Sequence, residues 1–222
     1  MNLEERAVAG LHDFLVRSVL ARSPFIRGGQ AVDLGAGSGA MAVRLRDLGF
    51  HVQAADIERA TFKADVPFTQ LDLNTPDFAS TLGEGRFDTV TAVEVIEHLE
   101  SPIAFLRGVG RLLTENGIAL VTTPNVGNVA ARLKLLAFGK LRTMDEKNPE
   151  HISPVFYDLF VRQYLPRAGL SLVSHSVYPE NDYPLTARRW LVPLFKTLAK
   201  VLPGPAVAGD CHVFVLRLAP PR

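Results

Sequence analysis

Residues 30–49, QAVDLGAGSGAMAVRLRDLG, pass from a short apolar run through closely spaced glycines into a helical pattern. Gly35, Gly37 and Gly39 follow the run at once, and a helix is expected over about 40–48. Glycine lets the backbone approach a ligand closely, and the first N–H groups of a helix have no partner within it. The segment therefore predicts a strand, a turn and a helix that bind a nucleotide-like cofactor, although a tight turn alone would also need glycine.

Further strands are expected after this unit, each a short apolar or alternating run. Helical patterns lie between several of them, notably at 103–113, and this alternation predicts an α/β fold with a parallel sheet covered on both faces. A helix at 3–20, closed by Ser23 and Pro24, precedes the sheet, and another follows at about 155–167. The expected strands are HVQAAD ending at Asp56, FTQLDLN ending near Asp72, FDTVTAVEV ending near Glu94, GIALVTTPN, GLSLVSHSVYP and DCHVFVLRLAP.

The chain of 222 residues is 47% hydrophobic, which is enough for one substantial core but hardly for two. We expect a single domain over 1–222, with an N-terminal helix in 1–29 and a cofactor-binding core in 30–125. Lys and Arg number 24 against 23 Asp and Glu, so no global field would attract nucleic acid. Cys211 is the only cysteine, no apolar run is long enough to cross a bilayer, and the acidic first residues are unlike a secretory signal. A cytoplasmic protein is therefore expected, at most peripheral at a membrane.

Acidic residues are expected in the first strand and at the ends of the next two. Asp56 ends the second strand, where a carboxylate can accept hydrogen bonds from both hydroxyls of a ribose; it could instead cap a helix. Asp72 could accept from an adenine amino group, with Leu71 and Leu73 against the ring, or it could be a turn residue. Asp33 lies within an apolar strand, and a buried charge there needs a polar partner such as a cofactor ammonium group.

The whole series resembles a known family. The run VDLGAGSGAMA, the acids described above, FDTVTAVEVIEHLESP, GIALVTTPN and EHISPVFYDLFVRQYLPRAGL are similar to the class I S-adenosylmethionine-dependent methyltransferases, nearest to the ubiquinone-biosynthesis O-methyltransferase type. The glycines also match the dinucleotide fingerprint, but Gly39, the EVIEHLE run and the final strand pair favour the methyltransferases.

The resemblance covers about residues 30–177 and implies a Rossmann-like, mostly parallel seven-stranded sheet whose last strand is antiparallel. It also implies S-adenosylmethionine as the cofactor, with its methionine part near Asp33, its ribose at Asp56, its adenine near Asp72, and Glu94 beside the reaction centre. The expected cofactor-binding residues are Asp33, Gly35, Ala36, Gly37, Gly39, Asp56, Ile57, Asp72, Leu73 and Glu94.

A second cluster follows the fourth strand. Glu94, Glu97 and His98 would share one side of a helix, and carboxylate and imidazole ligands suit magnesium, manganese or zinc. Some related O- and RNA-methyltransferases bind metal with a similar Glu-x-x-Glu-His group, which makes His151 a candidate further ligand. In a metal-free protein these residues would only shape the pocket, and His98 or His151 could remove a proton from the acceptor.

Two segments exceed what the sheet requires, 126–150 after the fifth strand and 180–209 between the final strands. Both leave from the side where open α/β sheets bind ligands, so we expect helical lids over the site, the second centred on residues 190–198. Each is basic and amphipathic. This pattern fits ordinary packed helices, or else contact with a lipid-like acceptor or a membrane surface.

These features predict methyl transfer from S-adenosylmethionine to a small-molecule or lipid-like acceptor at an oxygen atom, with a divalent cation such as Mg²⁺ as a candidate second cofactor. No protein partner is implied. An RNA ribose methyltransferase is the alternative enzyme, and it would need a concentrated basic groove. A non-enzymatic cofactor-binding interaction module is the other alternative.

Overall fold

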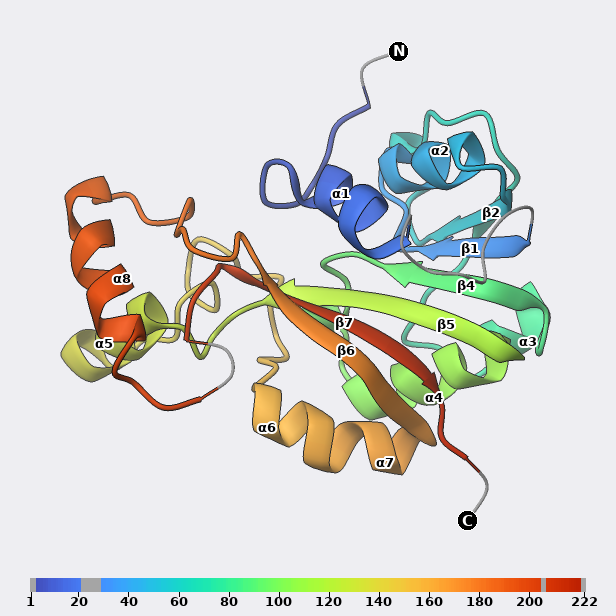
Figure 1. The fold of residues 1–222 in the computed structure, drawn as a ribbon. Helices are drawn as coiled ribbons and strands as arrows, with labels where there is room; N and C mark the ends of the chain where they lie inside the picture. Colours follow the sequence, from blue (N-terminus) through green and yellow to red (C-terminus); the bar gives the residue numbers. More distant parts are fainter. Residues whose placement is uncertain (1–2, 21–28, 205–206, 221–222) are drawn as a thin grey trace.

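The computed structural model describes residues 3–20, 29–204 and 207–220, and it contains one seven-stranded sheet (Figure 1). The strand order is β3-β2-β1-β4-β5-β7-β6, so the expected Rossmann-like α/β architecture is confirmed. The strands are β1 (Gln30–Leu34), β2 (His51–Asp56), β3 (Phe68–Gln70), β4 (Phe87–Ala92), β5 (Leu113–Pro124), β6 (Leu170–Tyr178) and β7 (Cys211–Leu218).

The first five strands pair in parallel. From β1 the chain winds outward through β2 and β3, and it then returns to β4 on the other side of β1. Ligands of open α/β sheets bind where the strand order reverses, outside the carboxyl ends of the strands. The topology therefore directs attention to the crevice between β1 and β4.

The last strand, β7, is antiparallel to both of its neighbours, as expected. It inserts between β5 and β6, and His212 lies opposite Thr123 on one side and Val177 on the other. β6 is consequently an edge strand that joins the sheet only through β7.

Helices cover both faces of the sheet (Figure 1). The helix α4 (Pro102–Leu112) begins where Ser101 Oγ accepts a hydrogen bond from Ala104 N (3.3 Å) and Pro102 occupies the first helical position. Among the described residues, no helix is both long and apolar enough to cross a membrane. One face carries α1 (Leu11–Phe14), the π-helical turn η1 (Leu15–Val19) and α2 (Ala40–Asp47), and the other carries α3 (Phe78–Leu82), α4 (Pro102–Leu112) and the continuous segment α6 (Tyr157–Leu159), η5 (Phe160–Tyr164) and α7 (Leu165–Ala168).

The two insertions form a small helical unit beyond the carboxyl end of β5 (Figure 1). The first contains α5 (Val129–Phe138), and the second contains the short turn η6 (Arg189–Leu191) and α8 (Val192–Ala199). α5 and α8 pack together through their own hydrophobic cluster, separate from the two clusters that cover the sheet.

The expected N-terminal helix over 3–20 is wrong at its start. It begins only at Leu11, because Gly10 adopts a left-handed backbone conformation (φ 80°) directly before it. Its expected end at Ser23 and Pro24 lies outside the described residues.

Two strands also end earlier than expected. β3 ends at Gln70 because Asp72 belongs to a turn in which its carboxylate accepts a hydrogen bond from Asn74 N (2.8 Å). β4 ends at Ala92 because Glu94 has a positive φ of 55°, which extended backbone does not allow.

Candidate active site

A pocket of about 850 Å³ opens at the carboxyl ends of β1, β2 and β4. It lies at the reversal of strand order, and both insertions and the N-terminal segment contribute to its walls. Gly39 is the one expected cofactor-binding residue that does not line it. The others all do: Asp33, Gly35, Ala36, Gly37, Asp56, Ile57, Asp72, Leu73 and Glu94.

The glycines of the turn have different tasks. A Cβ at Gly35 (φ 67°) would lie 2.4 Å from Val95 Cγ2, so this position has no room for a side chain. A Cβ at Gly37 (φ 51°) would meet nothing within 4 Å, which leaves its backbone open to the pocket. Gly39 (φ 91°) packs closely instead, since its Cβ would lie 2.3 Å from Ala64 Cβ. We therefore assign Gly39 a packing role rather than the expected cofactor contact.

Asp56 ties the end of β2 to the glycine turn. Its Oδ2 accepts a hydrogen bond from Gly37 N (2.8 Å), and its Oδ1 accepts one from Glu58 N (2.9 Å). The following helical turn has Glu58 rather than Asp56 at its N-cap, so the capping alternative is wrong. Ile57 beside it lines the pocket and is 62% exposed, so its side chain is free to contact a ligand.

Asp72 is a turn residue, as one interpretation expected, and it also lines the pocket, where its contact with adenine stays a prediction. Leu73 accompanies it on the pocket wall. Leu71 packs instead against the hydrophobic cluster on the α4 face of the sheet, and the expected contact of Leu71 with an adenine ring is wrong.

Asp33 is only 2% exposed. Thr91 Oγ1 donates a hydrogen bond to its Oδ1 (2.7 Å), while no described protein group bonds to its Oδ2. Burial raises the pKa of this carboxyl to about 7, because Thr91 and the nearby backbone of Ala42 compensate only part of the cost of removing a charge from water, and the charge of Asp56 adds to that cost. The free oxygen is suited to a cationic ligand group.

Glu94 forms hydrogen bonds with residues of the strands β5 and β7. Thr122 Oγ1 accepts from Glu94 N (3.0 Å) and donates to Glu94 Oε1 (2.9 Å), and Cys211 Sγ donates to Oε2 (3.6 Å). Burial raises the pKa of Glu94 to about 7. Its positive φ separates it from the turn η4 (Ile96–His98), so Glu94, Glu97 and His98 do not share one helical face as expected.

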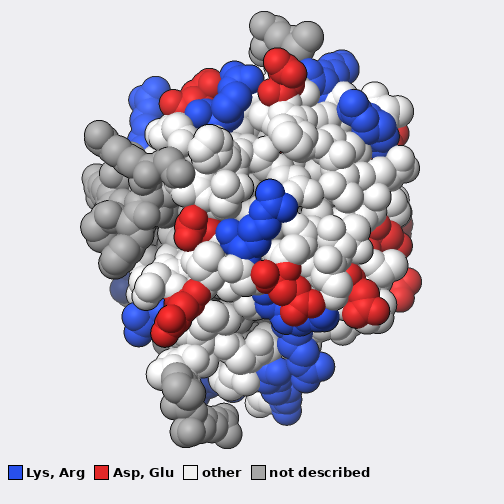
Figure 2. All heavy atoms as spheres, turned by 90° about the vertical axis from the view of Figure 1, so that its right-hand side faces the viewer, with Lys and Arg blue, Asp and Glu red and all other residues white. Residues whose placement is uncertain are grey.

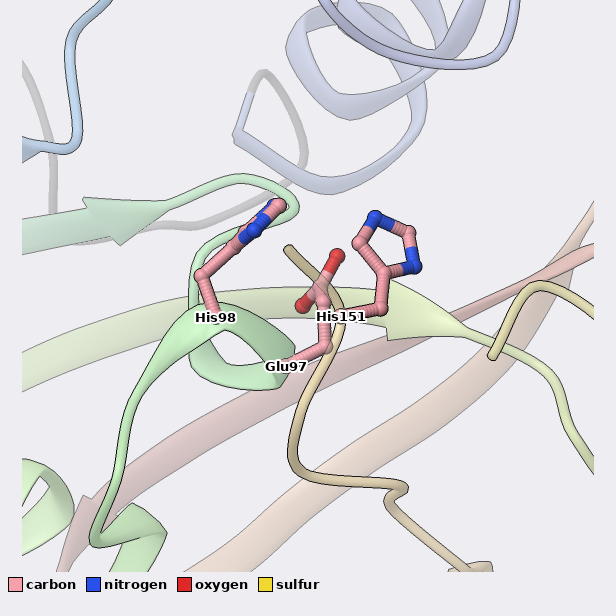
Figure 3. A group of neighbouring side chains, drawn as sticks. All are labelled: Glu97, His98 and His151. Carbon is pink, nitrogen blue, oxygen red and sulfur yellow. The ribbon is translucent and has the colours of Figure 1, made fainter. Parts of the chain in front are cut away.

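The structure brings Glu97, His98 and His151 together instead. Figure 3 shows their side chains turned toward one another, and one ligand atom of each lies within 4.8 Å of the other two. The carbonyl oxygen of Glu97 accepts hydrogen bonds from Ile152 N and Ser153 N, both at 2.9 Å. These backbone bonds hold the loop that carries His151 beside η4, which sequence spacing could not predict.

The chemical state of this group follows from its neighbours. His98 Nδ1 lies 3.2 Å from the carbonyl oxygen of Glu150, which can only accept, so Nδ1 carries the proton and Nε2 is free. Burial, together with His151, lowers the pKa of His98 and keeps the ring neutral. Burial and then the charge of Glu94 raise the pKa of Glu97 well above its ordinary value. No hydrogen bond of good geometry reaches the Glu97 carboxyl or His151 Nδ1 among the described residues, although Thr123 and the backbone of Glu97 lie near enough to the carboxyl to offset part of the rise in its pKa.

The pocket also includes residues that the sequence did not indicate. The N-terminal segment supplies Glu4, Val8 and His12, and Ser38 Oγ donates a hydrogen bond to the carbonyl oxygen of Glu4 (2.7 Å). The insertions supply Leu185 and Thr143. None of these positions carries a local motif, since only the tertiary fold brings them to the site.

The expected cover over the pocket is wrong in its position. Trp190 is 73% exposed and Phe195 packs against Tyr183 with ring centroids 5.4 Å apart, and neither lines the pocket. Within the insertions, the wall is made by loops outside α5 and α8, namely by Thr143, Asn148, Glu150 and Leu185, and His151 follows directly after the first insertion. The helices α5 and α8 use their buried faces on each other instead.

A doubly wound sheet with an antiparallel last strand, and a pocket bordered by acids at successive strand ends, define the class I S-adenosylmethionine-dependent methyltransferases. A family model described as a methyltransferase domain matches residues 5–175, and the chain belongs to this family. Membership implies S-adenosylmethionine as the cofactor.

Three known proteins illustrate the similarity. A ubiquinone biosynthesis O-methyltransferase from Caulobacter vibrioides is 36% identical over 132 residues, which are 56% of this chain and 50% of the relative. The chain thus matches about half the length of this relative. A Haloferax volcanii complex of the Trm112 methyltransferase activator with a methyltransferase gives a TM-score of 0.64 at 18% identity, covering 90% of this chain and 87% of the other. A SAM-dependent methyltransferase from Archaeoglobus fulgidus gives 0.60 at 15% identity, covering 92% and 93%. At these identities the structural similarity establishes the fold alone.

Proposed function

We propose that the protein transfers a methyl group from S-adenosylmethionine to an oxygen atom of a small-molecule or lipid-like acceptor. The observation that carries this proposal is the presence in one pocket of two kinds of group, the carboxylates of Asp33 and Asp56 and the cluster of Glu97, His98 and His151. The first kind suits the amino acid and ribose of the cofactor, and the second suits an acceptor oxygen. The name of the Caulobacter relative supports oxygen as the methylated atom.

The residues present fit this cofactor. The buried Oδ2 of Asp33 has no protein partner and would accept a hydrogen bond from the cofactor ammonium group. Each Asp56 oxygen accepts one backbone hydrogen bond and retains a lone pair for a ribose hydroxyl. The exposed side chain of Ile57, with Leu73, would be covered by adenine.

When bound, the cofactor supplies a methyl group already activated by its sulfonium. The task of the protein is then mainly to position the acceptor in line with the methyl group and to exclude water. The free Nε2 of His98 is suited to accept the proton of an acceptor hydroxyl. His151 lies against the same ring, with centroids 4.7 Å apart, and is the second candidate base.

A divalent cation held by Glu97, His98 and His151 is the finer part of this proposal, and Glu94 does not belong to the ligand set. Two features support a cation. Both oxygens of the buried Glu97 are unpartnered, and the Nδ1–H of His98 donates to a carbonyl, which orients Nε2 as metal-ligating histidines are oriented. A cation such as Mg²⁺ would polarise the acceptor oxygen. In a metal-free protein, His98 would act as the base alone.

The decisive experiment incubates the purified protein with methyl-labelled cofactor and separated lipid, small-molecule and RNA fractions of a lysate. Label in a base-stable, oxygen-linked product from the lipid or small-molecule fraction would support the proposal. Label only in RNA would favour the ribose methyltransferase. Cofactor binding by calorimetry without label in any fraction would favour a non-enzymatic interaction module.

Two further observations bear on these alternatives and on location. On the face shown in Figure 2, described Lys and Arg side chains alternate with Asp and Glu and do not merge into a basic groove. This face lies at the amino ends of the parallel strands (Figure 1), away from the pocket, and its described residues offer no basic groove for RNA. Cys211 is buried and unpaired, which is compatible with the cytoplasmic location that we propose.

A further inference from the structure

The helix α8 is apolar on two sides, and only one of them is packed. Val192 and Phe195 are buried against α5 and Tyr183. Leu194 of the helix is 49% exposed, and the apolar residues that flank the helix are more exposed, Trp190 in the preceding turn η6 at 73% and Val201 after the helix at 76%. Their spacing of i, i+4 and i+11 would place the three side chains on one stripe if the period of α8 continued through its two flanks. A helix that is apolar on a second, uncovered side requires another contact surface.

The neighbouring helix adds to this surface. At the end of α5, Leu136 is 85% exposed and Phe138 is 73% exposed, although both are large apolar side chains. Since α5 and α8 pack together at one end of the molecule (Figure 1), these side chains belong to a single projecting unit. Exposed apolar groups gathered on one unit mark an interaction surface, whereas scattered ones need no explanation.

The charges of this unit have one sign. The spans 129–140 and 188–201 contain no Asp or Glu. Lys134, Lys140 and Arg189 form ion pairs with acids outside these spans. No other basic residue of the two spans has an acid within ion-pair distance among the described residues. The basic residues are Arg132, Lys134, Lys140, Arg188, Arg189, Lys196 and Lys200.

We propose that the unit of α5 and α8 is a docking site for the surface of a bilayer that contains anionic lipids. Trp190, Leu194 and Val201 enter the boundary between headgroups and acyl chains, while Lys196 and Lys200 remain at headgroup level. Interfacial helices with an apolar stripe and basic flanks bind membranes in this way. A second copy of the chain is a poorer partner, because the interface would bring two surfaces of the same positive sign together.

Docking of α8 would also place the pocket near the bilayer surface. The segment that carries α8 also contributes Leu185 to the pocket wall. A membrane-bound α8 therefore holds the pocket close to the lipid surface, where a lipid-like acceptor could enter with little exposure to water. This inference does not depend on methyl transfer, since binding to vesicles is measured without substrate or cofactor.

The chain offers a direct probe, because Trp190 is its only tryptophan and is exposed. Vesicles of phosphatidylglycerol and phosphatidylcholine should shift its emission to shorter wavelength, and brominated acyl chains should quench it. Vesicles of phosphatidylcholine alone should produce at most a small shift. Raising the salt concentration should weaken binding to the anionic vesicles.

Variants separate the two components of the surface. Lys196→Gln with Lys200→Gln should weaken binding to anionic vesicles by about tenfold or more, since each cation near the surface contributes to affinity. Arg46→Gln with Arg162→Gln is the matched control, because both are exposed and lie on other elements. Leu194→Ser with Val201→Ser should abolish the emission shift, and Val173→Ser, 51% exposed on β6, is its control. Circular dichroism establishes that each variant is folded.

Two results would overturn the proposal. An unchanged emission spectrum in the presence of anionic vesicles would show that Trp190 does not enter a bilayer. A shift to shorter wavelength that depends on protein concentration without lipid, with a matching increase in mass by light scattering, would identify a second copy as the partner.

Discussion

The guanidinium of Arg142 donates a hydrogen bond to the carboxylate of Asp210, and both side chains are buried. The second oxygen of Asp210 accepts a hydrogen bond from Leu185 N (2.7 Å). The carboxylate of Asp210, directly before β7, thus forms hydrogen bonds with both insertions. Thr143 and Leu185, adjacent to these bonds, line the pocket, so the pair fixes the outer wall of the site.

Breaking this pair should therefore be costly. Arg142→Met leaves the Asp210 carboxylate buried without its cation, and we expect a loss of about 3–5 kcal/mol in the free energy of unfolding. Combining Arg142→Met with Asp210→Asn should recover part of the loss, because the uncompensated charge is then removed. Urea unfolding followed by circular dichroism measures both. A change below about 1 kcal/mol for the single variant would contradict the importance of the pair.

Asp56→Ala should weaken binding of S-adenosylmethionine by at least about tenfold, because charge-assisted hydrogen bonds to ribose are lost. Titration calorimetry measures the change. Asp158→Ala, at an exposed position on α6, is the matched control and should bind as the unmodified protein does. Equal affinities of the two variants would remove Asp56 from the cofactor site.

The affinity for S-adenosylmethionine should also depend on pH through Asp33. In the cofactor-free protein the pKa of this carboxyl is raised to about 7 by burial, so it becomes protonated as the pH falls below 7. An ammonium partner requires the carboxylate, and the affinity should fall by up to about tenfold per pH unit between pH 7 and 5.5. Asp33→Asn should bind weakly at every pH and show a flatter profile. A wild-type affinity that does not change over this range would exclude an ionic role for Asp33.

Removal of metal should reduce turnover if the proposed cation is present. We expect chelator dialysis to lower the methyl-transfer rate by at least about tenfold, with recovery on adding Mg²⁺ or Mn²⁺. Glu97→Gln should lower the affinity for the metal while leaving the affinity for S-adenosylmethionine nearly unchanged. Full activity after dialysis, with no metal found by elemental analysis, would leave His98 as a base in a metal-free site.

Two neighbouring histidines, of which His212 is buried and His175 half-buried, should make the fold sensitive to acid. His175 Nε2 and His212 Nδ1 lie 3.1 Å apart, and burial lowers their pKa values to about 4 and about 3. The unfolded chain takes up protons at these rings near pH 6.5, whereas the folded chain does not, so stability is lost as the pH falls below that value. For His212 the slope approaches about 1.4 kcal/mol per pH unit between pH 6 and 4.

His212→Leu should flatten this acid dependence of the unfolding midpoint. His51→Gln, at an exposed position on β2, provides the control for loss of a histidine. Parallel acid profiles of the His212→Leu variant and the unmodified protein would show that other groups determine the sensitivity.

The strand–turn–helix unit and the succession of strands along the chain could be predicted because each depends on local pattern, whereas the seven-stranded sheet was expected only from the family resemblance. The glycines of residues 35–39 predict a turn, and the apolar runs predict strands, without any knowledge of distant contacts. Asp56 was identified by its place at a strand end, and its contact with Gly37 follows directly from parallel pairing of β1 with β2.

The remainder of the site depends on contacts between distant segments. His151 lies beside Glu97 because Ile152 N and Ser153 N donate hydrogen bonds to the Glu97 carbonyl oxygen. Backbone hydrogen bonds of this kind do not depend on residue type, so the sequence cannot predict them. The grouping of Glu94 with Glu97 and His98 on one helical face was wrong because a positive φ in a residue other than glycine is not visible in sequence. For α8, amphipathic spacing correctly indicated a helix with basic flanks, but it could not tell which apolar side is covered by α5 and which remains exposed.

The insertion of β7 between β5 and β6 has a consequence for the order of events during synthesis. β6 has no sheet neighbour except β7, so its backbone groups find their strand partners only after residues 211–218 have left the ribosome. Until then β5 also presents an open edge. We expect a nascent chain stalled before β7 to resist proteases over β1–β4 and to be cut readily within β6, since the sheet is completed from its interior.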